Sequence, residues 1–132
     1  MIKSYKDLLI WQKSIDLVKE IYEVTSLFPK SEIFGITSQI QRAAVSIPSN
    51  IAGGSARSGS RELSQFLRIS LGSLAELDTQ ITIAYQLKYL SNKHKDLISC
   101  KIEELQKKTN SLISKIKNKS LATNHSPLTT TK

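Results

Sequence analysis

Three arginines lie in a stretch of the chain that contains no acidic residue. No Asp or Glu occurs between Glu32 and Glu62, and Arg42, Arg57 and Arg61 all lie within this interval. An arginine without a neighbouring carboxylate is suited to bind a phosphate group. Arg57 and Arg61 are the better candidates for this chemistry, because they lie in or beside a loop of small residues.

A second basic region is the C-terminal third of the chain. Nine Lys or Arg but only three Asp or Glu follow residue 90. This segment therefore contributes most of the net charge of +8 that the 132 residues carry. This surplus favours polyanion partners, although a solubilising lysine surface gives the same count. Aromatic residues do not alternate with these lysines, so any binding should involve the phosphate backbone, with little sequence preference. The candidate nucleic-acid contacts in this region are Lys101, Lys108, Lys115 and Lys119.

Other charges have an ordinary structural interpretation. Glu103 and Glu104 precede Lys107 and Lys108 by four residues, a spacing that supports a helix through side-chain pairs. Glu20 is expected to be solvated on the outer face of the first helix.

Arg42, Asn50 and Glu76 allow two interpretations. In the first, they form a structural polar cluster that fixes the pairing of two helices, and any buried charge among them needs its partner. In the second, Arg42 joins Arg57 and Arg61 in a groove that binds phosphate. We favour the structural interpretation for these three residues.

Residues suited to catalysis are scarce. His94 and His125 are the two histidines, and Cys100 has no histidine partner placed by the sequence. We expect Cys100 to be a small, half-buried residue rather than a nucleophile. The Glu-x-x-His pairs of di-iron bundles do not occur. The sequence therefore predicts no catalytic residue, no metal site and no cofactor.

The first half of the chain predicts two amphipathic helices. Asp7 is the expected N-cap of the first, which ends where Phe28-Pro29 disfavours helical geometry. Thr37 is the expected N-cap of the second, which Gly53-Gly54 should terminate near residue 52. The expected inward stripe of the first helix comprises Leu8, Trp11, Ile15, Val18, Tyr22 and Thr25, with Leu17, Ile21 and Val24 widening it.

The second half predicts two longer helices. The third should run from a cap at Ser58 or Ser60 to about residue 90, with Gly72-Ser73 allowing a close crossing against the second helix. The fourth should begin at Ser91 and fade at 117–119, with Leu97 among its inward residues. We predict residues 1–118 to be one bundle and residues 119–132 to be a disordered basic tail.

Pro48 lies in the middle of the second helix. It lacks the N–H that would bond to the carbonyl of Ala44, and its ring crowds that carbonyl. Proline costs about 3 kcal/mol against alanine in a helix interior, so we expect a kink supported by neighbouring helices. The predicted fold is all-α: a left-handed, antiparallel up-down four-helix bundle with a proline-kinked second helix.

A set of motifs surrounds Pro48. The central motif reads Arg42-Ala43-Ala44-x-Ser46-Ile47-Pro48-x-Asn50-Ile51-Ala52-x-Gly54-x-x-Arg57. The flanking motifs are Asp7-Leu8-x-x-Trp11-Gln12-Lys13, Phe28-Pro29-Lys30-x-Glu32, Phe66-Leu67 and Gly72-Ser73-Leu74-x-Glu76-Leu77. Together they resemble the signature of the 23S rRNA intervening-sequence protein family, and the resemblance covers roughly residues 5–117. In this family a glutamate usually occupies the position of Gly53, so any role of that carboxylate is absent or displaced here.

The resemblance implies a ring-like homo-oligomer, with a pentamer as the form associated with the family. It also implies an association with RNA or DNA, because such frames occur inside rRNA genes. The alternative function is a protein-interaction or assembly module, for example an accessory subunit of a reverse transcriptase. No apolar run is long enough to cross a membrane and no signal peptide is present, so we expect a cytoplasmic location without membrane contact.

Overall fold

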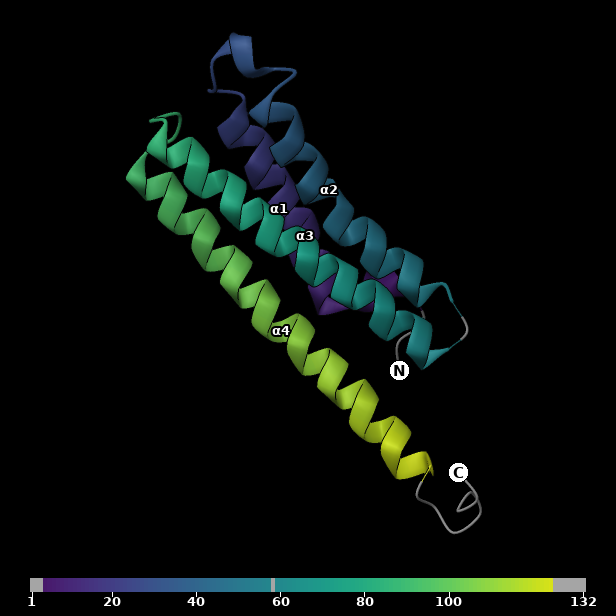
Figure 1. Cartoon of the computed structure of the whole chain (residues 1–132). Coiled ribbons are helices and arrows are strands. Elements are labelled where there is room, and N and C mark those ends of the chain that lie inside the picture. Colours follow the sequence, from purple (N-terminus) through teal and green to yellow (C-terminus); the bar gives the residue numbers. More distant parts are fainter. Residues whose placement is uncertain (1–3, 58, 125–132) are drawn as a thin grey trace.

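The computed structural model describes residues 4–57 and 59–124, and within them the secondary structure is entirely helical. Four α-helices pack side by side (Figure 1) and confirm the predicted all-α four-helix bundle. The kink at Pro48 and the antiparallel order remain predictions. The helices are α1 (Leu9–Thr25), α2 (Ile36–Ser55), α3 (Ser60–Gln86) and α4 (Asn92–Asn124), with short 3-10 helices η1 (Tyr5–Asp7) and η2 (Lys30–Glu32).

One hydrophobic core joins all four helices. Its centre consists of branched aliphatic side chains that are completely shielded from solvent, and α2 and α3 form the most extensive of the helix contacts. Core side chains from each helix in turn include Leu17, Ile47, Leu74 and Ile98.

The predicted inward stripe of α1 was correct only in part. Leu8 and Thr25 at its ends are buried, as are the residues that were expected to widen it, but the middle of the stripe is not. Leu17 and Ile21 are fully buried, whereas Ile15 and Tyr22 remain 41% and 46% exposed. The helix carries two apolar stripes about a third of a turn apart, and periodicity cannot say which of them the other helices cover. They cover the stripe that contains Leu17.

The start of α1 also differs from the prediction. Ser4, not Asp7, is the capping residue: its hydroxyl accepts a hydrogen bond from the N–H of Lys6, and the Asp7 carboxylate accepts one from the N–H of Ser4. This reciprocal pair of hydrogen bonds is a capping box that stabilises the N-terminus of η1. Leu8 then adopts extended geometry and α1 begins at Leu9 without a side-chain cap.

Gly53 and Gly54 do not terminate α2. The helix begins after Gly35, with Thr37 buried in its first turn, and continues through both glycines to Ser55. A Cβ added to Gly54 would lie 2.6 Å from the Cβ of Phe66 in α3. Gly54 therefore permits the close approach of α2 and α3 instead of ending the helix.

The predicted close contact at Gly72 was wrong, because Gly72 is exposed and a Cβ there would meet no atom within 4 Å. The neighbouring Ser73 faces α2, where its hydroxyl shares a 2.6 Å hydrogen bond with that of Ser46. The third helix also ends earlier than predicted, at Gln86. Lys88 has a left-handed backbone (φ 67°), and the N–H of Tyr89 bonds to the carbonyl of Ala84, as in a Schellman C-cap.

The fourth helix is longer than predicted. The hydroxyl of Ser91 accepts a hydrogen bond from the N–H of His94, so the predicted start is confirmed. Leu97 is exposed, not inward. The helix continues to Asn124 and passes beyond the ends of the other helices (Figure 1). The first residues of the predicted tail are thus helical, and residues 125–132 lie outside the described part.

Candidate nucleic-acid interface

Most of the predicted basic contacts lie at one end of the bundle. Arg57 lies in the short connection that follows α2, and Arg61 lies in the first turn of α3 directly after it. Figure 1 shows that this connection and the C-terminal half of α4, which carries Lys115 and Lys119, lie toward the same end. We call this region the basic end, defined by Arg57, Arg61, Lys108, Lys115 and Lys119.

The two arginines of the basic end project into solvent. Both side chains are exposed, and the guanidinium carbon of Arg57 lies 5.2 Å from the centre of the Phe66 ring. A cation–π contact of this kind orients the guanidinium and leaves its N–H groups available. Within the described residues, neither arginine forms an ion pair with a carboxylate.

Lys108 and Lys115 lie on the seam between α1 and α4. Together with Leu8, Leu9 and Ile10 they line a mainly apolar cleft of about 340 Å³. Their stems contribute to its walls, and the ammonium groups can remain in water at its rim. Neither lysine is ion-paired in the described structure.

Lys101 lies apart from this group. Its ammonium nitrogen is 3.3 Å from a carboxylate oxygen of Glu20 in α1, so Glu20 is ion-paired and not simply solvated as expected. Glu104 likewise pairs with Lys13 of α1 at 3.2 Å, not with Lys108 of its own helix. These two pairs tie α4 to α1 and neutralise the middle of the seam, leaving its positive charge toward the basic end.

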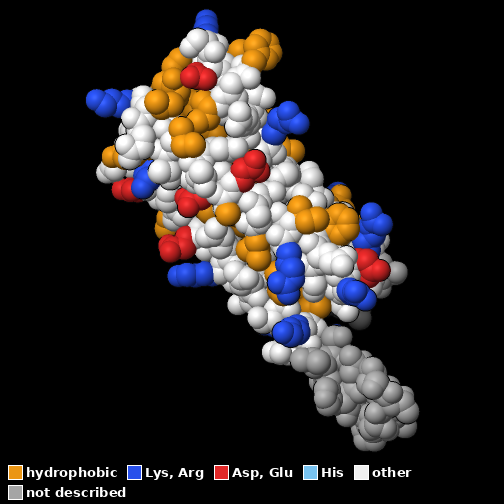
Figure 2. Space-filling model, viewed as in Figure 1, with side chains coloured by type: hydrophobic (Ala, Val, Ile, Leu, Met, Phe, Trp, Pro, Cys, Tyr) orange, Lys and Arg blue, Asp and Glu red, His pale blue; other side chains and the backbone are white. Residues whose placement is uncertain are grey.

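The surface view agrees with this distribution. Figure 2 shows Lys and Arg side chains outnumbering acidic ones over the lower part of the molecule, where acidic side chains also occur among them, whereas acidic and basic side chains are more evenly mixed above. Such a one-sided arrangement is the electrostatic footprint expected for a polyanion-binding surface.

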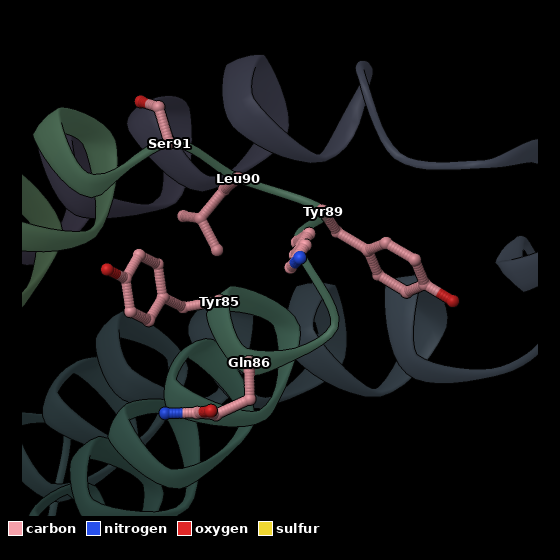
Figure 3. Close-up of a pocket in the computed structure, with 6 residues that line it drawn as sticks. Tyr85, Gln86, Tyr89, Leu90 and Ser91 are labelled. Atoms are coloured by element: carbon pink, nitrogen blue, oxygen red, sulfur yellow. The ribbon is translucent and has the colours of Figure 1, made fainter.

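The opposite end has a pocket of different character. Tyr85, Gln86, Lys88, Tyr89 and Ser91 contribute to a cavity of about 440 Å³ at the α3–α4 turn. In Figure 3, Tyr85 and Tyr89 point to opposite sides of this turn, with Gln86 below and Ser91 above. The cavity brings no cluster of acid, base and nucleophile together.

Tyr89 connects this turn to the α1–α2 connection. Its hydroxyl donates a 2.8 Å hydrogen bond to the carboxylate of Glu32, and its ring packs against Phe28. The hydrogen bond to Glu32, with partial desolvation and the negative charge of the carboxylate, raises the pKa of the Tyr89 phenol above its ordinary value. This contact is structural.

Other residues suited to chemistry are scattered. Cys100 is exposed, so the expectation that it is half-buried was wrong. His125 lies outside the described residues. In residues 4–57 and 59–124, no group of three or more His, Cys, Asp or Glu is placed to hold a metal ion. None of the described helices has both the length and the hydropathy of a membrane-spanning segment.

A family model described as "23S rRNA-intervening sequence protein" matches residues 6–111 of the chain. The match covers α1, α2, α3 and more than half of α4, and thus most of the bundle. The chain belongs to this family. No curated protein matches it.

The structure explains one glycine of the family signature and locates the departure at another. Gly54 has to lack a side chain because of Phe66, as described above. Gly53 has room for one, since its Cβ would contact only the edge of the Phe66 ring at 3.4 Å. The Arg57 guanidinium lies against the same Phe66 ring, so a glutamate at this position would lie close enough to pair with it. This intervening-sequence protein lacks that carboxylate, so Arg57 has no acidic side chain at this position to pair with.

The signature residues Arg42 and Asn50, with Glu76 of α3, line one shallow surface groove between α2 and α3. The groove has a volume of about 450 Å³. Arg42 and Glu76 are exposed and form no ion pair in the described structure, and the Asn50 amide donates to the carbonyl of Ser46. The three residues are thus brought together, but at the surface.

The hydrogen bonds that join α2 to α3 come instead from serines. Besides the Ser46–Ser73 contact, the hydroxyl of Ser70 donates to the carbonyl of Ile47, beside Pro48, at 3.1 Å. Sequence reasoning missed these residues as a polar cluster. The available signal was small hydroxyl residues on the helix faces that otherwise carry core aliphatics.

Proposed function

We propose that this 23S rRNA-intervening sequence protein is a non-catalytic, oligomeric module that contacts the phosphate backbone of RNA or DNA through its basic end. The observation that carries the proposal is the position of Arg57, Arg61, Lys108 and Lys115, which lie toward one end without acidic partners. Because the family resemblance favours a pentamer, several basic ends would face one polymer and multiply the affinity. The proposed location is the cytoplasm, with no cofactor.

The expected binding is electrostatic and weakly selective. Arginine and lysine side chains on a surface with little aromatic character neutralise phosphates but do not read bases. Arg57 is held against Phe66, so a basic side chain of the protein already covers this ring. RNA and DNA of unrelated sequence should therefore bind with similar affinity.

The test is fluorescence anisotropy with unrelated RNA and DNA oligonucleotides at one low salt concentration. Arg57→Ala combined with Arg61→Ala should weaken binding of every oligonucleotide by a similar factor. The matched control is Lys30→Ala combined with Lys93→Ala, two exposed lysines outside the basic end. Equal losses from both pairs would refute a localised interface.

A second candidate function is a protein-interaction module without nucleic-acid binding, such as an accessory subunit of a reverse transcriptase. The apolar side chains near the α1–α2 connection favour it, because Phe34 is 95% exposed and Leu27 and Ile33 are also exposed. Absence of binding to any oligonucleotide at low salt would support this function and overturn the first.

A further inference from the structure

We propose that the apolar cleft between Lys108 and Lys115 holds an unstacked base of a single-stranded nucleic acid, while the two lysines hold phosphates on either side of that base. The inference rests on the proposed function and adds the form of nucleic acid that the basic end binds best. It arises from a feature that phosphate binding alone does not use, the aliphatic surface between the two lysines.

The cleft lies where the start of α1 meets α4. Leu8 and Ile10 line it but are themselves buried. Leu9 is 52% exposed and Leu112 is half-buried, so the accessible apolar surface of the cleft comes mainly from these two side chains. Its volume of about 340 Å³ is near the lower end of the range for ligand pockets, about 300–1,000 Å³. A cleft of this size accommodates a small planar group.

The charges around the cleft favour an anionic occupant. Lys108 and Lys115 are the charged residues that line it, and neither is ion-paired in the described structure. Glu104, one turn before Lys108, is paired with Lys13 of α1 at 3.2 Å. Asp7 lies just before the cleft residues of α1, and its carboxylate is hydrogen-bonded to the backbone at the start of η1. The cleft therefore combines an apolar floor with two cations that have no carboxylate of their own.

The two lysines bracket the apolar surface. They are seven residues apart on α4, or about 10.5 Å along the helix at 1.5 Å per residue. Leu112 lies between them on the same face, one turn from each. A single strand that crosses the cleft can therefore place phosphates at both ammonium groups and turn a base between them onto Leu112.

A nucleobase matches this surface chemically. Its flat faces are apolar, so covering Leu9 and Leu112 with one removes aliphatic surface from water, and every base has such a face. Its edge is polar, and the Ser111 hydroxyl that lines the cleft can both donate and accept a hydrogen bond. A hydroxyl that serves either role does not select among the bases. Insertion of a base is thus consistent with the weak sequence preference proposed above.

A duplex does not offer a base in this way. Its bases are stacked and paired inside the helix, and bringing one out costs the energy of that stacking and pairing. A duplex can still contact the lysines and arginines of the basic end through its phosphates. Duplex binding should therefore depend on charge alone, whereas single-strand binding should depend on charge and on the aliphatic surface of the cleft.

The position of the cleft favours a polyanion over a protein partner. Figure 1 places the start of α1 toward the end of the bundle that holds the α2–α3 connection, which includes Arg57. A partner protein with an apolar side chain between two carboxylates would satisfy the cleft itself. A nucleic-acid strand carries a charge at every unit, so it can also continue from the cleft to the other cations of the basic end.

The test changes Leu9, which is exposed and uncharged, and leaves every cation in place. Fluorescence anisotropy at one low salt concentration would compare three probes: a mixed-sequence DNA single strand, its duplex, and an abasic strand of the same length. Leu9→Ala should weaken binding of the DNA single strand about threefold, because it removes part of the apolar contact. Leu9→Phe should strengthen that binding by about the same factor, because bases stack on aromatic rings.

Both Leu9 variants should bind the duplex and the abasic strand as the wild type does, since these probes contact only the cations. The matched controls are Leu97→Ala and Leu97→Phe, which change another exposed leucine near the start of α4, away from the cleft. They should leave the binding of all three probes unchanged.

The outcomes separate this inference from the proposed function. A wild type that binds none of the three probes would overturn both. If the wild type binds all three probes and the Leu9 variants bind the DNA single strand equally well, the inference is overturned, the proposed function stands, and the cleft serves a partner of another class. A change of the same size for all three probes in the Leu9 variants would also overturn the inference, since the leucine would then not act through a base.

Discussion

Replacing Gly54 with alanine tests how closely α2 and α3 approach each other. Two effects oppose one another at this position. Alanine is favoured over glycine by about 1 kcal/mol within a helix. The added Cβ, however, would lie 2.6 Å from the Cβ of Phe66 and 3.2 Å from a methyl group of Leu63.

The steric effect should dominate. Carbon atoms pack best at about 3.5–4.0 Å, so the two helices would have to separate by about 1 Å. The Phe66 Cβ is fixed to its backbone and cannot rotate away. Overpacking of this kind costs about 1–3 kcal/mol. Subtracting the propensity gain, we expect Gly54→Ala to destabilise the protein by up to about 2 kcal/mol.

Gly53 provides the matched control in the next position of the same helix. Its added Cβ would meet Phe66 at an ordinary 3.4 Å, so Gly53→Ala should stabilise by up to about 1 kcal/mol. Thermal unfolding followed by circular dichroism, at one protomer concentration, should therefore separate the two variants. The expected gap is up to about 12 °C, at about 4 °C per kcal/mol. Equal stabilisation by both variants would refute the close approach.

Three further predictions concern other parts of the molecule. Gly53→Glu should weaken oligonucleotide binding more than Gly53→Gln in anisotropy measurements, because the carboxylate would pair with Arg57; equal effects would contradict this. Pro48→Ala should raise the free energy of unfolding, measured in urea, by clearly less than the roughly 3 kcal/mol that proline costs in a helix interior. The reason is that the neighbouring side chains pack against the proline. A gain of the full amount would mean that the kink has no packing role. The pKa of the Tyr89 phenol is raised in the folded protein, so its hydrogen bond to Glu32 should stabilise the fold below the ordinary phenol pKa of 10.0. This stabilisation should fall as pH rises through the folded pKa. Tyr89→Phe should abolish this alkaline loss of stability in unfolding experiments, and an unchanged loss would contradict the prediction.

The order of the helices could be predicted from the sequence because each has a strong apolar period. The face that each helix buries was harder to predict. On α1, both the stripe with Leu17 and the stripe with Ile15 satisfy helical spacing, and the choice depends on where α2 and α4 pack. The role of Gly54 was missed for the same reason, since a glycine that allows a close crossing looks like one that ends a helix.

The sequence predicted which basic residues belong to the candidate site better than it predicted which of them lie together or form ion pairs. The arrangement of Arg57 and Arg61 beside the α2–α3 connection followed from local sequence. The ion pair between Lys101 and Glu20 did not, because it joins residues 81 positions apart. An ion pair of this kind depends on how the helices pack, for which the sequence contains no local signal.

The most direct test of the central claim is the salt dependence of nucleic-acid binding. If all five residues of the basic end contact phosphate, the slope of log K against log salt should be about −3.5 per protomer on single strands, so a fourfold rise in salt weakens binding roughly 100-fold. Combining Arg57→Ala with Arg61→Ala should reduce that slope by about 1.4, whereas the Lys30→Ala and Lys93→Ala pair should leave it unchanged. A slope that is the same in the arginine variant as in the wild type would contradict the claim that the basic end binds the phosphate backbone.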